Sequence, residues 1–312
     1  MRILSRVIAL VALVAGLAVL PGSPAHAAYY NTYDDVAATP DTSDTTGAQA
    51  FAAGSTYLYS VKNRTSDDGR AVIYRVNKST GDRVVMTNGT DKRAYNTWLG
   101  HANDMTIVDI DGKHHFFVVT MEKTGAQLVK LRYDGTTYYK VGSYKITLDG
   151  AVAAPSGVTR VAVSSTTIRF FFKSGRQVYN GTLPLRADSG TIAITKAFLL
   201  DVEGALVNGA TVSDLGSFSH QGVYYDAANQ TLYVPLTKDN RSIVLVYRSI
   251  TSARTTTATS DKDLSFRITS SAYSKFEIEG VGLSGGRLYF NTNRASSSGA
   301  HDGVHVFKSY TV

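Results

Sequence analysis

The sequence predicts an all-β fold, a five-bladed β-propeller of four-stranded antiparallel blades. One short phrase, a polar residue followed by a small and an apolar residue, occurs five times at intervals of 53 to 65 residues. This spacing suits one four-stranded blade with long loops, whereas a β-sandwich, the alternative, spaces its strands without such a higher repeat. The phrases are Gln49-Ala50-Phe51, Asn103-Asp104-Met105, Ser156-Gly157-Val158, Gln221-Gly222-Val223 and Glu279-Gly280-Val281, and the second is looser because Asp104 takes the small-residue place.

Each phrase leads into β-rich text that predicts two further strands. The first set of strands is expected at 57–59, 115–117, 168–170, 231–233 and 287–289. The second set is expected at 71–74, 127–131, 177–179, 242–247 and 304–307. Turn sequences such as Asp67-Asp68-Gly69 and Tyr133-Asp134-Gly135 separate them, which predicts meander hairpins. The polar stretch 251–257 is expected to be a surface loop.

The two ends of the mature chain are expected to meet. The last predicted strand, 304–307 continuing to Tyr310, leaves little sequence for an outer strand. The segment Tyr29–Tyr33 is free to pair there, which would close the ring and cover an exposed strand edge.

The first 27 residues have the pattern of a secretory signal peptide. Arg2 and Arg6 precede an apolar run over 7–20, and Ala25-His26-Ala27 forms an A-x-A cleavage signal. We therefore expect a signal peptide at 1–27, a single propeller domain at 28–312, and secretion to the extracellular space. No later stretch approaches the roughly 18 apolar residues of a membrane helix.

Composition narrows the possible chemistry. The chain has no cysteine, which excludes thiol catalysis and cysteine-zinc sites. It has 32 basic and 25 acidic residues, a mild and scattered positive balance. This balance favours anionic envelope polymers such as teichoic acids as partners, while the absence of a dense basic stripe argues against nucleic acid. No cofactor is expected.

Equivalent positions in propeller blades converge on one axis, so the five polar residues should form a ring. The expected ring contains Gln49, Asn103, Ser156, Gln221 and Glu279, with His101, Asp104 and His220 beside it. Amides, imidazoles and carboxylates together suit sugar hydroxyls, although such groups can also serve only to hold water in a channel. Trp98 precedes His101 and could stack on a sugar face or belong to the core.

Two other kinds of site were weighed for the same ring. A glycoside hydrolase needs two carboxylates about 5 to 10 Å apart, for which Asp104 and Glu279 are the candidates and Glu277 is next. A metal could take His101, Asp104, His220 and Glu279, but these residues have no local ligand spacing, so no metal site is predicted.

The sequence also resembles a known family. The text from Asn96 to Thr106 resembles the helveticin J-like group of secreted class III bacteriocins, as do Ser219–Tyr225 and Phe276–Gly280. The resemblance implies an antibacterial protein that acts at the bacterial envelope, and it assigns no catalytic residue. The resulting hypothesis is a secreted antibacterial protein that binds a cell-envelope glycan through the polar ring. The alternatives are a glycoside hydrolase and a non-catalytic protein-interaction propeller.

Overall fold

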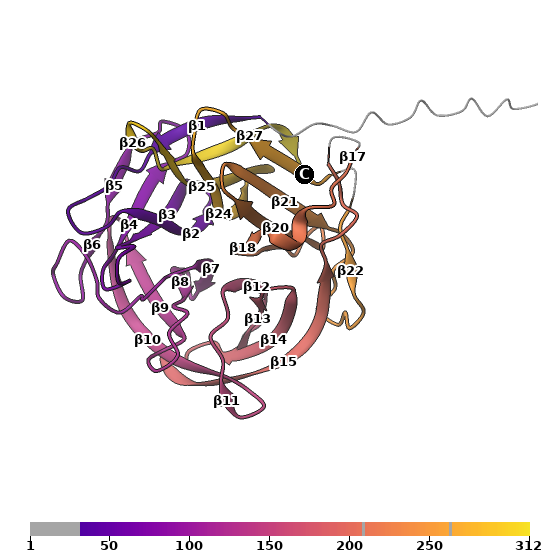
Figure 1. Ribbon diagram of the computed structural model, residues 1–312. Coiled ribbons are helices and arrows are strands. Elements are labelled where there is room, and N and C mark those ends of the chain that lie inside the picture. The colour runs from indigo at the N-terminus through magenta and orange to yellow at the C-terminus, as the bar shows by residue number, and fades with distance from the viewer. Residues whose placement is uncertain (1–31, 208–209, 262–263) are drawn as a thin grey trace, which may run out of the picture.

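The computed structural model describes residues 32–207, 210–261 and 264–312 (Figure 1). The predicted signal peptide and residues 28–31 lie outside this part. The fold is all-β with almost no helix, and the single helix in the described ranges is the short 3-10 turn η1 (Leu215–Ser217). No helix in this part of the chain is long and apolar enough to cross a membrane.

The strands form five antiparallel meanders, which we number I to V along the chain. Meander I contains β2 (Gly47–Ala53), β3 (Tyr57–Asn63), β4 (Ala71–Asn77) and β5 (Arg83–Val85). Meander II contains β7 (Asp104–Ile110), β8 (Lys113–Val119), β9 (Leu128–Asp134) and β10 (Thr137–Leu148). Meander III contains β12 (Gly157–Val163), β13 (Thr167–Ser174), β14 (Gln177–Pro184) and β15 (Ser189–Asp201).

The last two meanders are less regular. In meander IV, β18 (Ser219–His220) and β19 (Tyr224–Asp226) both pair with β20 (Thr231–Lys238), which is followed by β21 (Arg241–Tyr247) and β23 (Phe266–Thr269). Meander V contains β24 (Lys275–Ser284), β25 (Arg287–Ser296), β27 (Gly303–Thr311) and β1 (Tyr33–Ala38). Short accessory strands are β6 (Thr87–Asn88), β11 (Ala151–Val152), β16 (Leu206–Val207), β17 (Ala210–Thr211), β22 (Ala258–Thr259) and β26 (Gly299–Ala300). The expected strands are all present, and 251–257 is a loop.

The N-terminal segment pairs with the last strand, as expected, but slightly later in the sequence. Tyr33 lies opposite Phe307 and Ala38 opposite Gly303 in the antiparallel pair of β1 and β27. Asp35 contacts His305 across this pair at 2.7 Å. The edge of β27 is therefore covered by β1, and the expected pairing residues before Asn31 lie outside the described part.

Meanders II and III are joined in a way that the sequence did not predict. The long outer strands β10 and β15 pair in parallel, with Ser143 opposite Ser189 and Leu148 opposite Ile194. Both strands extend beyond their antiparallel partners, so their free edges meet. The two meanders thus belong to one continuous sheet, joined through their outer strands.

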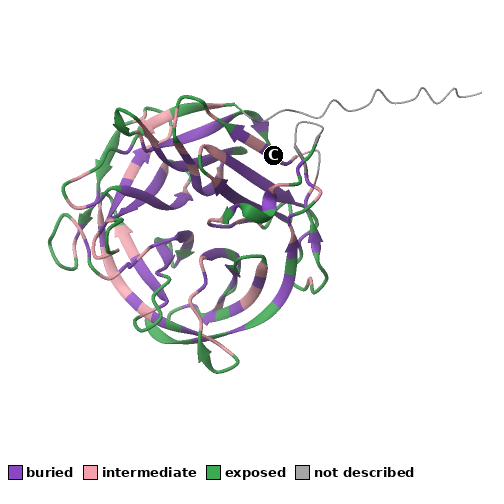
Figure 2. Cartoon of the chain, viewed as in Figure 1, coloured by how far each residue is buried: buried purple, intermediate pink, exposed green. Residues whose placement is uncertain are grey.

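The first strand of each meander lies near a common centre (Figure 1). We call β2, β7, β12, β19 and β24 the inner strands. In that order each contacts the next, and β24 contacts β2. Figure 2 shows that the strands near this centre are largely buried.

The hydrophobic core lies between successive meanders. Tyr59 packs on Phe116 between I and II, Phe117 on Phe170 between II and III, and Phe171 on Tyr225 between III and IV. Tyr233 meets Tyr310 between IV and V, and Phe51 clusters with Val304 and Val306 between V and I. Alternating apolar strand residues supply these faces.

Candidate functional site

The five polar residues of the repeated phrase lie toward the same end of the inner strands, which we call the ring end. Gln49 lies in β2, Asn103 and Ser156 immediately precede β7 and β12, Gln221 lies between β18 and β19, and Glu279 lies in β24. The repeat therefore predicted where polar groups gather, because equivalent positions enter the centre from equivalent strands.

Asp104 links three meanders at this end. One carboxylate oxygen, Oδ1, accepts a hydrogen bond from the amide of Met105. The other, Oδ2, accepts hydrogen bonds from the amides of Val158 and Val223, and all three distances are 2.9 Å. The side chain is buried, and burial raises its pKa while the hydrogen bonds from Val158 and Val223 and the charge of Lys173 oppose this rise. Asp104 is thus first of all a structural connection.

Gly222 makes this connection possible. A Cβ at Gly222 would lie 2.7 Å from Asp104 Oδ1 and 3.1 Å from the Glu279 carbonyl oxygen. The Gly222 amide donates to that same carbonyl at 3.0 Å. The Asp104 carboxylate and the Glu279 backbone carbonyl therefore both lie beside Gly222.

Lys173, on β13, is a site residue that the sequence analysis missed. Its ammonium group is completely buried and has no hydrogen-bond partner in the described structure. Burial lowers the pKa of Lys173, and the charge of Asp104 raises it. A signal was available, because Lys173 directly follows the apolar run Phe170–Phe172 in a strand that must be buried.

Glu279 and Glu277 form a carboxyl pair on β24. A β-bulge lies between Ile278 and Gly280. Burial raises the pKa of Glu279 well above its usual range, and Glu277, which shares a hydrogen bond with it, raises it further. Glu277 in turn contacts Lys275 at 2.8 Å. Glu279 therefore carries a proton at a pH where an ordinary glutamate is charged.

His220 lies in the same region with an unused nitrogen. Burial lowers the pKa of His220 to about 4, and Lys173 and Arg176 lower it as well. Its Nδ1 is buried without a hydrogen-bond partner in the described structure. The imidazole is therefore neutral near pH 7, and its Nδ1 can form one hydrogen bond with a ligand or a water.

The predicted amides are partly used by the fold. The Asn103 Nδ2 group donates to the Ser156 carbonyl at 2.6 Å, and Ser156 N donates to the Lys173 carbonyl at 2.9 Å. Gln221 Nε2 donates to Thr237 Oγ1 at 3.1 Å. Gln49 Oε1 is buried without a hydrogen-bond partner in the described structure.

Two predicted residues point elsewhere. His101 Nδ1 lies 3.0 Å from Asp68 Oδ2, in the loop after β3. Trp98 donates to Asp91 at 3.0 Å and packs edge-on against Tyr138 of the outer strand β10. Trp98 therefore lies on the outer side of meander II instead of the ring end. Within the described ranges, no His, Cys, Asp and Glu side chains gather as a set of metal ligands.

Comparisons with known proteins identify the fold but assign the chain to no family. No family model and no curated protein matches the chain. Among solved structures, a GH43_1 enzyme from Xanthomonas citri complexed with xylotriose is similar, with 9% identity over 89% of this chain and 90% of that chain and a TM-score of 0.52. CoXyl43, a GH43 β-xylosidase/α-arabinofuranosidase from a compost metagenome, has 8% identity over 88% and 93% of the two chains and a TM-score of 0.50.

These similarities correct one prediction. The expected antibacterial, bacteriocin-like protein that binds envelope glycan is contradicted, because the solved structures of similar fold are glycoside hydrolases. At such low identity the comparison shows that this chain shares their fold.

Proposed function

We propose that the five meanders are the blades of a closed five-bladed propeller and that the protein is a secreted glycoside hydrolase acting on a polysaccharide. Support for closure comes from the circular contacts of the inner strands and from the apolar core between meanders V and I. Support for secretion comes from the signal-peptide pattern of residues 1–27. We also propose that the chain shares ancestry with the helveticin J-like group, without the antibacterial activity of that group.

The observation that carries the hydrolase proposal is the buried carboxyl of Glu279 at the ring end, next to Glu277 on the same strand. Glycosidic bond cleavage needs an acid that protonates the leaving oxygen and a second carboxylate nearby. Glu279 suits the first need because burial and Glu277 raise its pKa well above the usual range, which favours the protonated form.

Asp104 is the proposed second carboxylate. Its Oδ1 lies beside Gly222, whose amide donates to the Glu279 carbonyl, and Oδ1 accepts one amide hydrogen bond while Oδ2 accepts two. Burial raises the pKa of Asp104 to about 8, and the amide donors and Lys173 lessen this rise. In its charged form Asp104 would stabilise positive charge on the sugar or orient a water. His220 and Gln49 have free polar atoms for sugar hydroxyls.

The test is the release of reducing ends from xylan, arabinan and purified bacterial wall polysaccharide by the mature protein. We expect release from at least one polymer and a loss of about 100-fold or more in Glu279→Gln, the range for removing a general acid. The matched control is Glu203→Gln, since Glu203 is exposed and lies after β15, outside the proposed site.

Two results would contradict the hydrolase proposal. One is a folded wild-type protein that binds these polymers but releases no reducing ends. The other is release that Glu279→Gln leaves at the wild-type rate.

A further inference from the structure

The opposite end of the inner strands carries a groove that is separate from the ring end. Ala53, Ile107, Arg160, Tyr224 and Leu283 line a cavity of about 180 Å³ there. Gln49 and Ala53 lie four residues apart on β2, and strand rise puts about 13 Å between the two ends. The groove is thus outside the proposed catalytic site.

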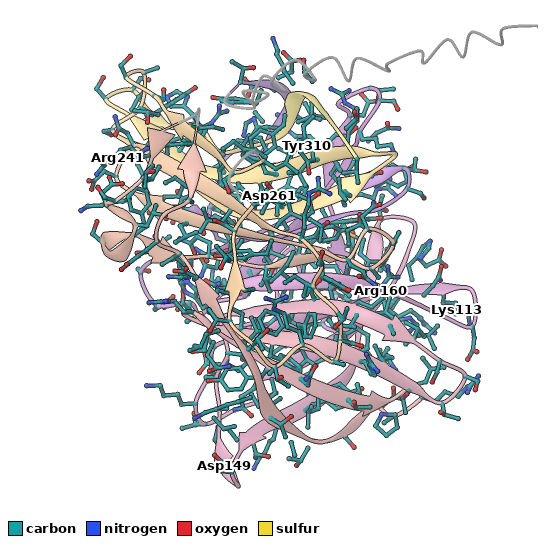
Figure 3. All side chains as sticks on the ribbon, turned by 90° about the vertical axis from the view of Figure 1, so that its right-hand side faces the viewer. Lys113, Asp149, Arg160, Arg241, Asp261 and Tyr310 are labelled. Atoms are coloured by element: carbon teal, nitrogen blue, oxygen red, sulfur yellow. The ribbon has the colours of Figure 1, made fainter. Side chains whose placement is uncertain are left out.

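This cavity continues outward between meanders I and II. It shares Ile107 and Arg160 with a cavity of about 400 Å³, which in turn shares His114, Tyr133 and Gly135 with one of about 560 Å³. Because neighbouring cavities share lining residues, the three together form one groove. Figure 3 shows Arg160 and Lys113 toward one side of the molecule and Arg241 on the other.

Aromatic side chains form one part of the groove wall. The Tyr133 ring is stacked between Phe116, with a centroid distance of 4.5 Å, and His114, at 5.6 Å. Tyr57 and Tyr139 complete this wall. Phe116 is a fully buried core residue, so the position of this stack does not depend on a ligand.

Basic side chains dominate the charge of the groove. Four basic residues line it, Arg75, Lys113, Arg132 and Arg160, against the acidic residues Asp109 and Asp134. Asp109 is already paired with His114 at 3.2 Å. Excess positive charge in a concave site attracts anions.

Two of the arginines are fixed in place. The Arg75 guanidinium lies 4.2 Å from the centre of the Tyr57 ring and donates to the Gly135 carbonyl at 2.6 Å. Arg132 lies over Tyr139 at 5.5 Å. By contrast, Arg160 is exposed, and no carboxylate of the described residues lies within ion-pair distance of it. Arg160 is therefore available to bind an external anion.

We propose that this groove binds an anionic glycan, a sugar or alditol chain that carries carboxylate or phosphate groups. Arginine binds both anions through paired N–H donors, and tyrosine and histidine rings pack against sugar faces. Single-stranded nucleic acid fits less well, because the Tyr133 ring already stacks on Phe116 and His114 within the protein instead of being free to stack on bases. The assignment to a glycan rests on the proposed function, in which the substrate is a polysaccharide.

The test is the affinity of the mature protein for polygalacturonate, for lipid-free wall teichoic acid and for neutral arabinoxylan, measured by calorimetry. We expect at least one anionic polymer to bind about tenfold or more tightly than arabinoxylan. Arg160→Ala should weaken that binding about tenfold, and 0.5 M NaCl, which screens the charges, should weaken it too. Comparison of polygalacturonate with teichoic acid distinguishes carboxylate from phosphate as the recognised group.

The charge-matched control is Lys196→Ala, since Lys196 is exposed on the outer strand β15 and should bind like wild type. Glu279→Gln should also retain this binding, which separates the groove from the hydrolase site. The proposal is overturned if neither anionic polymer binds more tightly than arabinoxylan, if folded Arg160→Ala binds like wild type, or if oligothymidylate binds more tightly than both anionic glycans. If the protein binds an anionic polymer but hydrolyses no polymer, the hydrolase proposal is rejected and the proposal of an anionic glycan groove stands.

Discussion

At the scale of single residues, the ring end combines groups whose charge depends on burial. Burial shifts the pKa values of Glu279, Asp104, Lys173 and His220 toward their neutral forms, and the charges of Asp104 and Lys173 oppose each other's shift. The sequence indicated Glu279, Asp104 and His220 as candidate site residues but gave Lys173 no role. Their protonation was not visible in the sequence, because desolvation depends on which side chains surround each group.

Glu279 should make stability and activity depend on pH. Its pKa is raised in the folded protein, so its contribution to stability is complete below the unfolded value near 4.5 and is lost as pH rises through the folded value. We expect the melting temperature of wild type to fall relative to Glu279→Gln as pH rises above about 4.5. Hydrolysis should decline over the upper part of the same range because the acid loses its proton.

Thermal unfolding of both proteins from pH 4 to 9 measures this difference. A constant gap between the two melting temperatures at every pH would show that Glu279 does not titrate with a raised pKa.

At the scale of the elements, a glycine allows three strand starts to meet. The carboxylate of Asp104, the first residue of β7, binds the amides of Val158 in β12 and Val223 before β19, and Gly222 leaves the space for it. The sequence marked this position as a small residue in a repeated phrase. The reason for it, the approach of Asp104 from another meander, appears only in the fold.

Gly222→Ala should therefore destabilise the protein. The new Cβ would overlap Asp104 Oδ1 and force the carboxylate away from its amide donors, at a cost of about 1–3 kcal/mol. Gly216→Ala is the control, because a Cβ at Gly216 meets nothing within 4 Å. Chemical denaturation measures both variants, and equal stability of the two would contradict the role given to Gly222.

At the scale of the whole molecule, the strand β1 packs on meander V and against the apolar cluster between meanders V and I. Tyr33 of β1 packs on Phe276 and Phe290 of meander V, and Arg294 contacts Asp35 at 3.3 Å. The strand β1 thus covers the edge of β27 and adds to the core between meanders.

A protein beginning at Thr39 lacks β1 and should unfold at a lower temperature than one beginning at Thr32. A fully buried side chain contributes about 1.5–3 kcal/mol, so the half-buried Tyr33 and Val36 contribute about half of that each, and 1 kcal/mol corresponds to roughly 2–4 °C in a chain of 150–250 residues. We expect a decrease of about 5 °C or more by calorimetry. Equal melting temperatures would show that β1 contributes no stability.

The sequence by itself determined the strands, the turns, the period of the repeat and the end of the inner strands at which polar residues gather. These features depend on local alternation and on repetition, which are written in the chain. Only the tertiary structure decided that β10 pairs with β15, that Trp98 faces an outer strand, that Lys173 is buried beside Asp104, and that a basic groove opens at the far end. Each of these depends on contacts between residues from different meanders, and no local pattern specifies which distant surfaces will exclude water from one another.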